Sequence, residues 1–255
     1  MKDIFLSVVI PAYDEMANFQ KGVLEKVYTY LSKRKYSYEV IIVDDGSTDG
    51  SIEFLKHFTK EHAQFRIIEN PHTGKAGAVT KGILASQGKY VLFTDADQAT
   101  PIEELEKILP QFNYGYDIVI GSRNTQRNGS PLSRQIISRG FILLRQMIVG
   151  LPNILDSQCG FKAFENNAAK NIFQKVYDMH DGFKQISGSA VTAGFDIELL
   201  FIAARMGYKI KEVPVKWLYV ETRRVSPVKD SIDGLSDMLK IRKNAIAGKY
   251  DYENK

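Results

Sequence analysis

The sequence contains a single cysteine, Cys159, which excludes an intrachain disulfide and is typical of a reducing compartment. It also lacks any apolar run near the roughly 18–20 residues that a membrane-spanning helix requires. Only about seven apolar-leaning residues precede Pro11, which is too few for a signal peptide. We therefore predict a cytoplasmic chain without a transmembrane segment.

Acidic residues are missing from one long stretch of the chain. Between Ile118 and Leu155 there is no Asp or Glu, but there are five arginines: Arg123, Arg127, Arg134, Arg139 and Arg145. The C-terminal part is also rich in cations: Lys209, Lys211, Lys216, Arg223, Arg224, Lys229, Lys240, Arg242 and Lys243. The net charge is only +4, so it is this distribution that predicts an anionic partner: phosphate, lipid headgroup or nucleic acid. A solvated basic face is the alternative.

The remaining composition, 255 residues with 44% hydrophobic and 25% charged side chains, is that of a globular protein. Strand signals occur at Phe5–Ile10, Val40–Val43, Phe65–Ile68, Tyr90–Phe93 and Ile118–Ile120. Helical periodicity lies between them, at Asn18–Arg34, Thr48–His62, Lys75–Ser86 and Ile102–Gln111, with start signals at Thr48 and Thr100–Pro101. This alternation predicts an α/β fold, a mostly parallel sheet with helices on both faces.

The second half is less regular. Helices are expected at Leu132–Gly150, Ala168–Tyr177, Asp196–Met206 and Ser231–Ala245, with a strand at Lys209–Trp217. We expect this half to complete an acceptor site rather than to form an independent core. The chain is thus predicted to be one domain, with residues 1–122 binding the donor and residues 123–255 binding the acceptor.

The most informative segment is Asp95-Ala96-Asp97, which follows the apolar run Tyr90–Thr94. That run is typical of a buried parallel strand, and ligands of open α/β sheets bind beyond the carboxyl ends of such strands. Two carboxylates one residue apart can hold a divalent cation, which in turn can hold a diphosphate. We therefore predict that Asp95 and Asp97 bind a metal, although Asp pairs also occur in turns and helix caps.

Two further acidic segments follow predicted strands. Pro11-Ala12-Tyr13-Asp14-Glu15 follows the first strand, and Asp44-Asp45-Gly46-Ser47-Thr48-Asp49 follows the second. A nucleotide would satisfy this edge, because a carboxylate can accept from a base N–H and Tyr13 can stack on the base. A dinucleotide cofactor is disfavoured, since no G-x-G-x-x-G turn follows the first strand. Turn and helix-cap chemistry is the alternative for Asp44, Asp45 and Asp49.

A fourth segment, Gly74-Lys75-Ala76-Gly77-Ala78, opens a predicted helix after the third strand. Its small residues allow close backbone approach, and Lys75 adds positive charge near a helix N-terminus. This is a favourable environment for phosphate.

These four segments, in this order and spacing, resemble the family-2 glycosyltransferases with the GT-A fold, a Rossmann-like fold, over roughly the first 165 residues. The resemblance implies a nucleotide-sugar donor, Mg²⁺ or Mn²⁺ on the D-x-D, and inversion at the anomeric carbon. It also implies that Tyr13, Glu15 and Asp44 frame the base, and that Asp95 touches ribose or metal while Asp97 ligates the metal. Pro11, Ala12, Asp45, Lys75, Ala96 and Gln98 complete the predicted donor site.

A second set of segments resembles one subgroup, the dolichyl- and polyprenyl-phosphate glycosyltransferases. The set is Gly121-Ser122-Arg123, Arg134, Ser138, and Asp156-Ser157-Gln158-Cys159-Gly160-Phe161-Lys162. The last of these, followed by Phe195–Leu200, is most similar to the dolichyl-phosphate β-glucosyltransferases. Relative to the compact family pattern, Asp178–Ala193 is interpreted as an insertion.

A lipid phosphate acceptor agrees with the residue pattern. Arg134 and Ser138 share a helix face and can meet one phosphate together with Arg123. The same helix carries many apolar residues and suits the interface of a membrane, with its arginines at headgroup level; an ordinary core-facing helix is the alternative. Asp156 is a candidate base, or a ligand that orients the sugar. Arg223 and Arg224 are candidates to close over the diphosphate.

We therefore predict metal-dependent transfer of a hexose, glucose from UDP-glucose, to a polyprenyl phosphate by a peripheral protein at the cytoplasmic membrane face. The predicted catalytic residues are Asp97, Arg123 and Asp156. Mannosyl or other hexosyl transfer, and transfer to a soluble glycan, are the alternatives within the class. A nucleotidyltransferase would need a Gly-rich loop after Ile10, and a lipid- or nucleic-acid-binding module would leave the acidic edge unexplained. We expect no nucleic acid partner, and a homo-oligomer stays open.

Overall fold

The structure, a computed structural model, describes residues 3–123, 140, 142, 144–151, 154–186, 193–218 and 227–251, without the side chains of 193 and 227–233. The predicted site residues Arg134, Ser138, Arg223 and Arg224 lie outside these ranges, as does most of the predicted helix Leu132–Gly150. Within the described ranges, no helix is long and apolar enough to cross a membrane.

The described strands form one sheet with the order β3-β2-β1-β4-β6-β5-β7. The strands are β1 (Leu6–Ala12), β2 (Tyr38–Asp44), β3 (Phe65–Glu69), β4 (Tyr90–Thr94), β5 (Ile118–Ser122), β6 (Phe161–Glu165) and β7 (Ile210–Pro214). β6 runs antiparallel to both of its neighbours, whereas the other pairs are parallel. The predicted mostly parallel α/β sheet is thus confirmed, and its strand order reverses beside β1.

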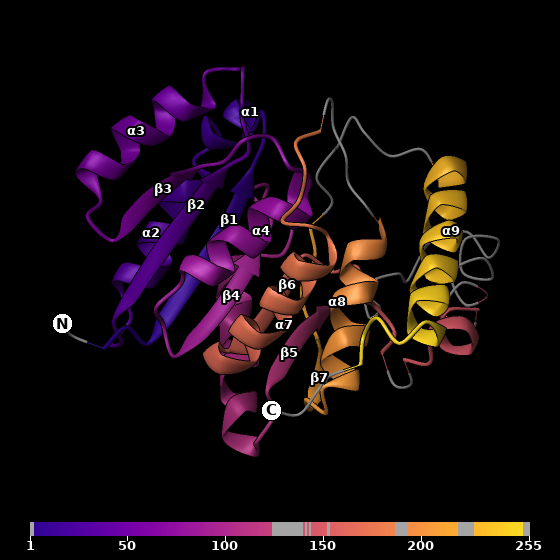
Figure 1. Ribbon diagram of the computed structural model, residues 1–255. Coiled ribbons are helices and arrows are strands. Elements are labelled where there is room, and N and C mark those ends of the chain that lie inside the picture. Colours follow the sequence, from indigo (N-terminus) through magenta and orange to yellow (C-terminus); the bar gives the residue numbers. More distant parts are fainter. Residues whose placement is uncertain are drawn as a thin grey trace.

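Helices cover both faces of this sheet (Figure 1). The helices are α1 (Met16–Phe19), α2 (Val23–Ser32), α3 (Ser51–Glu61), α4 (Gly74–Ala85), α5 (Leu105–Ile108), α7 (Asn166–Met179), α8 (Ala193–Arg205) and α9 (Pro227–Ile246), with 3₁₀ turns η1 (Ile102–Glu104) and η2 (Leu109–Tyr114). α4, α7 and α8 lie side by side in front of the sheet, and α9 packs outside α8.

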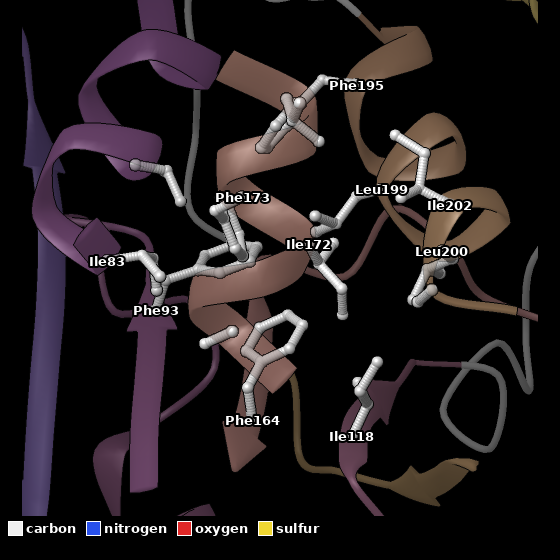
Figure 2. Packing of buried hydrophobic residues seen from close by; sticks show 14 of the residues in the cluster. Ile83, Phe93, Ile118, Phe164, Ile172, Phe173, Phe195, Leu199, Leu200 and Ile202 are labelled. Carbon is white, nitrogen blue, oxygen red and sulfur yellow. The ribbon is translucent and has the colours of Figure 1, made fainter. Parts of the chain in front are cut away.

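Alternating side chains of each strand enter two separate cores. On β1, Val9 belongs to the core under α4, α7 and α8, while Val8 and Ile10 belong to the core under α2 and α3. This is the period-two alternation of a strand that is buried on both faces. Figure 2 shows Phe164 of β6 and Phe173 of α7, whose ring centroids lie 5.5 Å apart in the first of these cores.

Three predictions of local structure are corrected. The predicted helix Asn18–Arg34 is interrupted between Phe19, where α1 ends, and Val23, where α2 begins after Gly22 with a φ of 75°. α3 begins at Ser51 rather than Thr48, because Gly50 has a φ of 91°, which lies outside the right-handed helical range. The predicted helix Ile102–Gln111 is a series of short 3₁₀ and α turns.

β6 was not predicted as a strand. Its first two residues, Phe161 and Lys162, were assigned only to an acceptor motif, and Lys162 is fully buried. An antiparallel strand inserted between β4 and β5 brings the Asp156–Gly160 segment against the end of β4. The fold thereby joins the two halves of the predicted site.

Candidate active site

The loops after β1 and β2 are tied together at the carboxyl edge of the sheet. The Asp14 carboxylate accepts from the Thr48 N–H at 2.8 Å, and the Asp49 carboxylate accepts from the Met16 N–H at 2.9 Å. Burial opposes ionisation of Asp49, but hydrogen bonds from Ser51 and from backbone N–H groups outweigh it and lower the pKa of this carboxyl. Asp14 and Asp49 therefore act as cross-links between two loops.

Asp44 and Asp45 are both buried, yet their surroundings differ. Asp45 accepts from the N–H groups of Thr73 and Gly74 at 2.9 and 2.8 Å, and so fixes the start of α4. Asp44 accepts from the Ser47 N–H at 3.2 Å, but its Oδ1 is buried without a hydrogen-bond partner among the described residues. Because an unpaired buried acceptor is costly, Asp44 is the one suited to accept from a ligand N–H.

An aromatic stack lies next to this carboxylate. The Tyr13 ring stacks on the His72 ring with centroids 4.2 Å apart and an interplanar angle of 18°. Ala12, at the end of β1, lies directly opposite Asp44 in the sheet register, and Pro11 lies opposite Val43. Glu15 accepts from the Asn18 side chain at 2.5 Å at the start of α1. The predicted base-framing residues are thus gathered at neighbouring strand ends.

Asp95 and Asp97 follow β4, as predicted, and Lys75 reaches them from the first turn of α4. The Lys75 Nζ lies 2.6 Å from Asp95 Oδ1. Burial opposes the charge of Lys75, but Asp95, Asp196 and Asp97 outweigh it and raise its pKa. The pKa of Asp97 is raised by burial and by the charge of Asp95. The pair therefore carries an unfavourable concentration of negative charge, which a cation would relieve.

The residues around the D-x-D are closely packed. Ala96 is buried, and Gln98 has a φ of 50°, which is unusual for a residue other than glycine. The Gln98 Nε2 donates to the Asp95 carbonyl at 2.9 Å, while its Oε1 is buried without a partner in the described part of the chain. A Cβ on Gly160 would lie 1.9 Å from Asp95 Oδ2, so only glycine allows this approach of the Asp156–Gly160 segment.

Arg123 and Asp156 form a two-pronged ion pair beside this segment. Arg123 Nε and Nη2 donate to the two Asp156 oxygens at 2.7 and 2.8 Å, and the Arg123 N–H donates at 2.9 Å. Burial opposes ionisation of Asp156, but the hydrogen bonds and charge of Arg123 outweigh it and lower its pKa. The Arg123 guanidinium also lies 6.0 Å from the centroid of Trp217. Of the three residues predicted to bind the acceptor phosphate, Arg123 is the one that lies within the described ranges.

The structure adds one pair that the sequence did not point to, Lys162 and Asp196, whose Nζ and Oδ1 lie 2.5 Å apart. Together these side chains form the charge cluster of the site, in which each cation has a carboxylate partner and one carboxylate is in excess. Its members are the carboxylates of Asp95, Asp97, Asp156 and Asp196 and the cations Lys75, Arg123 and Lys162.

The donor set at the D-x-D fits a divalent cation in part. Asp95 and Asp97 offer hard oxygen ligands, the type that Mg²⁺ and Mn²⁺ prefer. Within the described ranges no group of three or more His, Cys, Asp or Glu side chains is placed to hold a metal. Two carboxylates therefore suit a cation whose remaining ligands come from a diphosphate and water.

A cavity of about 400 Å³ opens beside Asp97 and Gln98. Lys21 and Lys26 line it from the α1–α2 region, and Leu218 lines the other side. A larger cavity of about 550 Å³, between α4, α8 and α9, contains none of the predicted site residues. The smaller cavity is the one that adjoins the D-x-D.

Comparison with known proteins gives one family. Residues 7–173 match the family described as Glycosyl transferase family 2. A dolichyl-phosphate beta-glucosyltransferase of Saccharomyces cerevisiae is 33% identical over 273 residues, covering 98% of this chain and 77% of that protein. One of Dictyostelium discoideum is 30% identical over 265 residues, covering 96% and 76%.

Among solved structures, glucosyl-3-phosphoglycerate synthase from Mycobacterium tuberculosis, in complex with Mn²⁺, UDP and glucosyl-3-phosphoglycerate, has the same fold. It superimposes with a TM-score of 0.56 at 17% identity, covering 94% of this chain and 80% of that one. The structural match shows the fold, and the sequence matches show the family.

Proposed function

Since this chain belongs to glycosyltransferase family 2, we propose that it transfers glucose from UDP-glucose to a polyprenyl or dolichyl phosphate, with inversion at the anomeric carbon. The observation that carries the proposal is the near full-length match to enzymes named dolichyl-phosphate beta-glucosyltransferase. The arrangement of the charge cluster supports it, because residues predicted to bind the donor and the acceptor lie close together in that cluster.

The base of the donor would bind between the loops after β1 and β2. The unpaired Oδ1 of Asp44 is suited to accept from the N–H of a uracil ring, and Tyr13 offers an aromatic face nearby. Asp45 would contribute to donor binding indirectly, by fixing the start of α4, since its oxygens already accept from the backbone there.

The diphosphate would lie over Asp95, Asp97 and Lys75. A divalent cation bound to Asp95 and Asp97 would neutralise the phosphates and stabilise the departing UDP. Lys75, 2.6 Å from Asp95, can donate to the same phosphate oxygens from the N-terminus of α4. Gln98 is placed beside them to contact the sugar or a phosphate.

The acceptor phosphate would be bound by Arg123, together with Arg134 and Ser138, which lie outside the described residues. A phosphate monoester is already anionic at pH 7, so no strong general base is required. Asp156 fits this chemistry, because its lowered pKa keeps it ionised and Arg123 occupies both of its oxygens. We assign Asp156 the role of orienting Arg123 toward the phosphate, and catalysis then rests on alignment and charge.

A lipid acceptor requires access to a membrane surface. Met147 and Leu144 are 82% and 40% exposed, and on α9 Leu239 and Ile246 are 55% and 76% exposed. Exposed cations accompany them on α9: Lys240, Arg242 and Lys243. Apolar side chains among basic ones suit peripheral binding to a bilayer that contains anionic lipids.

The direct test measures transfer of labelled glucose from UDP-glucose to a short polyprenyl phosphate, with Mg²⁺, with Mn²⁺ and with EDTA. We expect a product that extracts into organic solvent, depends on the metal and is lost in Asp97→Ala. The matched control is Asp178→Ala, which removes an exposed carboxylate on α7 and should retain full activity. Transfer from a different nucleotide sugar, or to a soluble glycan instead, would disprove the glucose or the lipid assignment while leaving the metal site standing.

A further inference from the structure

Lys162 is an unusual residue for its position in the sheet. It lies in β6 opposite Phe93 of β4 and Ile120 of β5, and its side chain is completely buried. Its neighbours on β6, Phe161, Ala163 and Phe164, are also buried. A buried ion pair is often no more stabilising than apolar residues of similar volume, so stability alone does not account for a lysine here.

The contacts of Lys162 lead to the D-x-D. The Lys162 Nζ donates to Asp196 of α8 at 2.5 Å and to the Cys159 carbonyl at 2.6 Å, and it lies 5.2 Å from the Phe93 ring centroid. Cys159 is joined to Gly160, the residue whose Cα approaches Asp95 so closely that no Cβ fits. The ammonium thus holds the backbone turn that lies against Asp95.

Asp196 completes the arrangement. It holds Lys162 from the first turn of α8, and its charge also acts on Lys75 and Arg123. The pair therefore links α8 to the turn that contacts Asp95, while its two charges offset each other within the cluster.

We propose that Lys162 and Asp196 are a positioning pair: they fix the Cys159–Gly160 turn against Asp95 and so set the affinity of the D-x-D for a complex of a divalent cation with UDP. This inference rests on the proposed function. Neither residue touches the substrate; each acts through the backbone at Gly160. Loss of the ammonium should let the turn shift, so that Asp95 no longer holds its orientation.

The test uses two variants of the whole chain, Asp196→Asn and the double variant Lys162→Met/Asp196→Asn. The single variant keeps the Lys162–Cys159 bond but leaves a buried cation without its carboxylate. The double variant removes both charges and should fold more stably than the single one. The quantity measured is the Mn²⁺ dependence of UDP binding, the ratio of UDP affinity with Mn²⁺ to that with EDTA, by titration calorimetry, alongside the melting temperature.

We expect the ratio to fall at least about tenfold in the double variant, an effect of the size expected when a residue that orients a metal ligand is lost. In Asp196→Asn the ratio should change less than about threefold. From the single to the double variant, the Mn²⁺ dependence of UDP binding should thus fall while the melting temperature rises. A purely structural role would not produce these opposite changes. The control is Glu198→Gln, two residues along α8, where a buried carboxylate bonds His180 and Tyr250 instead. Its ratio should equal that of the wild type.

A double variant with the wild-type ratio would overturn the positioning role and leave the proposed function intact. Wild-type protein whose UDP affinity is the same with Mn²⁺ and EDTA would overturn the metal-dependent donor site itself, and the positioning role with it.

Discussion

The two sides of the site hold their carboxylates in different ways. On the donor side, Asp14, Asp45 and Asp49 accept from backbone N–H groups and tie neighbouring loops together. On the predicted acceptor side, Asp156 is paired with Arg123, a cation that is itself largely buried. Hydrogen bonds to the backbone fix a shape, whereas paired charges also set the field that an ionic substrate meets. In the proposed function, the loops of the donor side would hold the base, and Arg123 and Asp156 would hold and align the acceptor phosphate.

The largest effect should come from the contact that joins the two sides. In Gly160→Ala the new Cβ would clash with Asp95, which must then move. We expect glucosyl transfer to fall about 100-fold or more, with a weaker response to Mn²⁺. The measurement is kcat/KM at several Mn²⁺ concentrations.

The control for that substitution is Gly140→Ala, since a Cβ there meets no atom of the described residues within 4 Å. Equal activity of the two alanine variants would show that the approach of Gly160 to Asp95 does not matter for the reaction.

The next effect concerns the acceptor side alone. Asp156→Asn weakens the hydrogen bonds and the ion pair that hold Arg123 in place. We therefore expect kcat/KM for the lipid phosphate to fall about 10- to 100-fold, while the affinity for UDP stays unchanged. Because the pKa of Asp156 is lowered, it is ionised throughout the neutral range, and the variant should keep the wild-type pH profile between about pH 6 and 9. A pH–rate limb that disappears in the variant would instead identify Asp156 as a base.

On the donor side, Asp44→Asn changes the one buried carboxylate oxygen that has no partner in the described structure. We expect UDP affinity to fall about tenfold, because the charge-assisted acceptor for the base N–H is lost. The KM of the lipid acceptor should stay within about twofold of the wild type. A change in acceptor KM instead of UDP affinity would break the division between the two sides.

The smallest effect lies outside both sides, at the His180–Glu198 pair of 2.7 Å. The hydrogen bond from His180 to Glu198 raises the pKa of the imidazole above 6.5. The stabilisation is therefore complete below pH 6.5 and is lost as the pH rises through the folded-state value. Since His180 is 42% exposed, we expect less than about 1 kcal/mol.

The check on this pair is the difference in melting temperature between the wild type and Glu198→Gln at about pH 6 and pH 8.5. The difference should shrink at the higher pH. A constant difference would mean that the charge on His180 contributes nothing to stability.

Much of the fold could be predicted from local pattern. The strands β1 to β5 and the helices α3, α4, α7, α8 and α9 were all expected within a few residues of their bounds. β6 was missed because its five residues, with a lysine in second place, have no clear periodicity. The break at Gly22 was missed because the apolar spacing continues through it.

The sequence by itself determined that acidic loops follow several parallel strands. Because the carboxyl ends of parallel strands lie at the same edge of a sheet, these loops also lie at one edge. The sequence could not determine which carboxylate takes which partner. Asp44 and Asp45 are adjacent in sequence, yet Asp45 accepts from the backbone at the start of α4, whereas one Asp44 oxygen has no partner among the described residues. Only tertiary structure decided this, and it alone brought Lys162 to Asp196 and Gly160 to Asp95. Such pairings depend on which chain segments pack together, and an antiparallel strand 66 residues or more beyond β4 cannot be inferred from local periodicity.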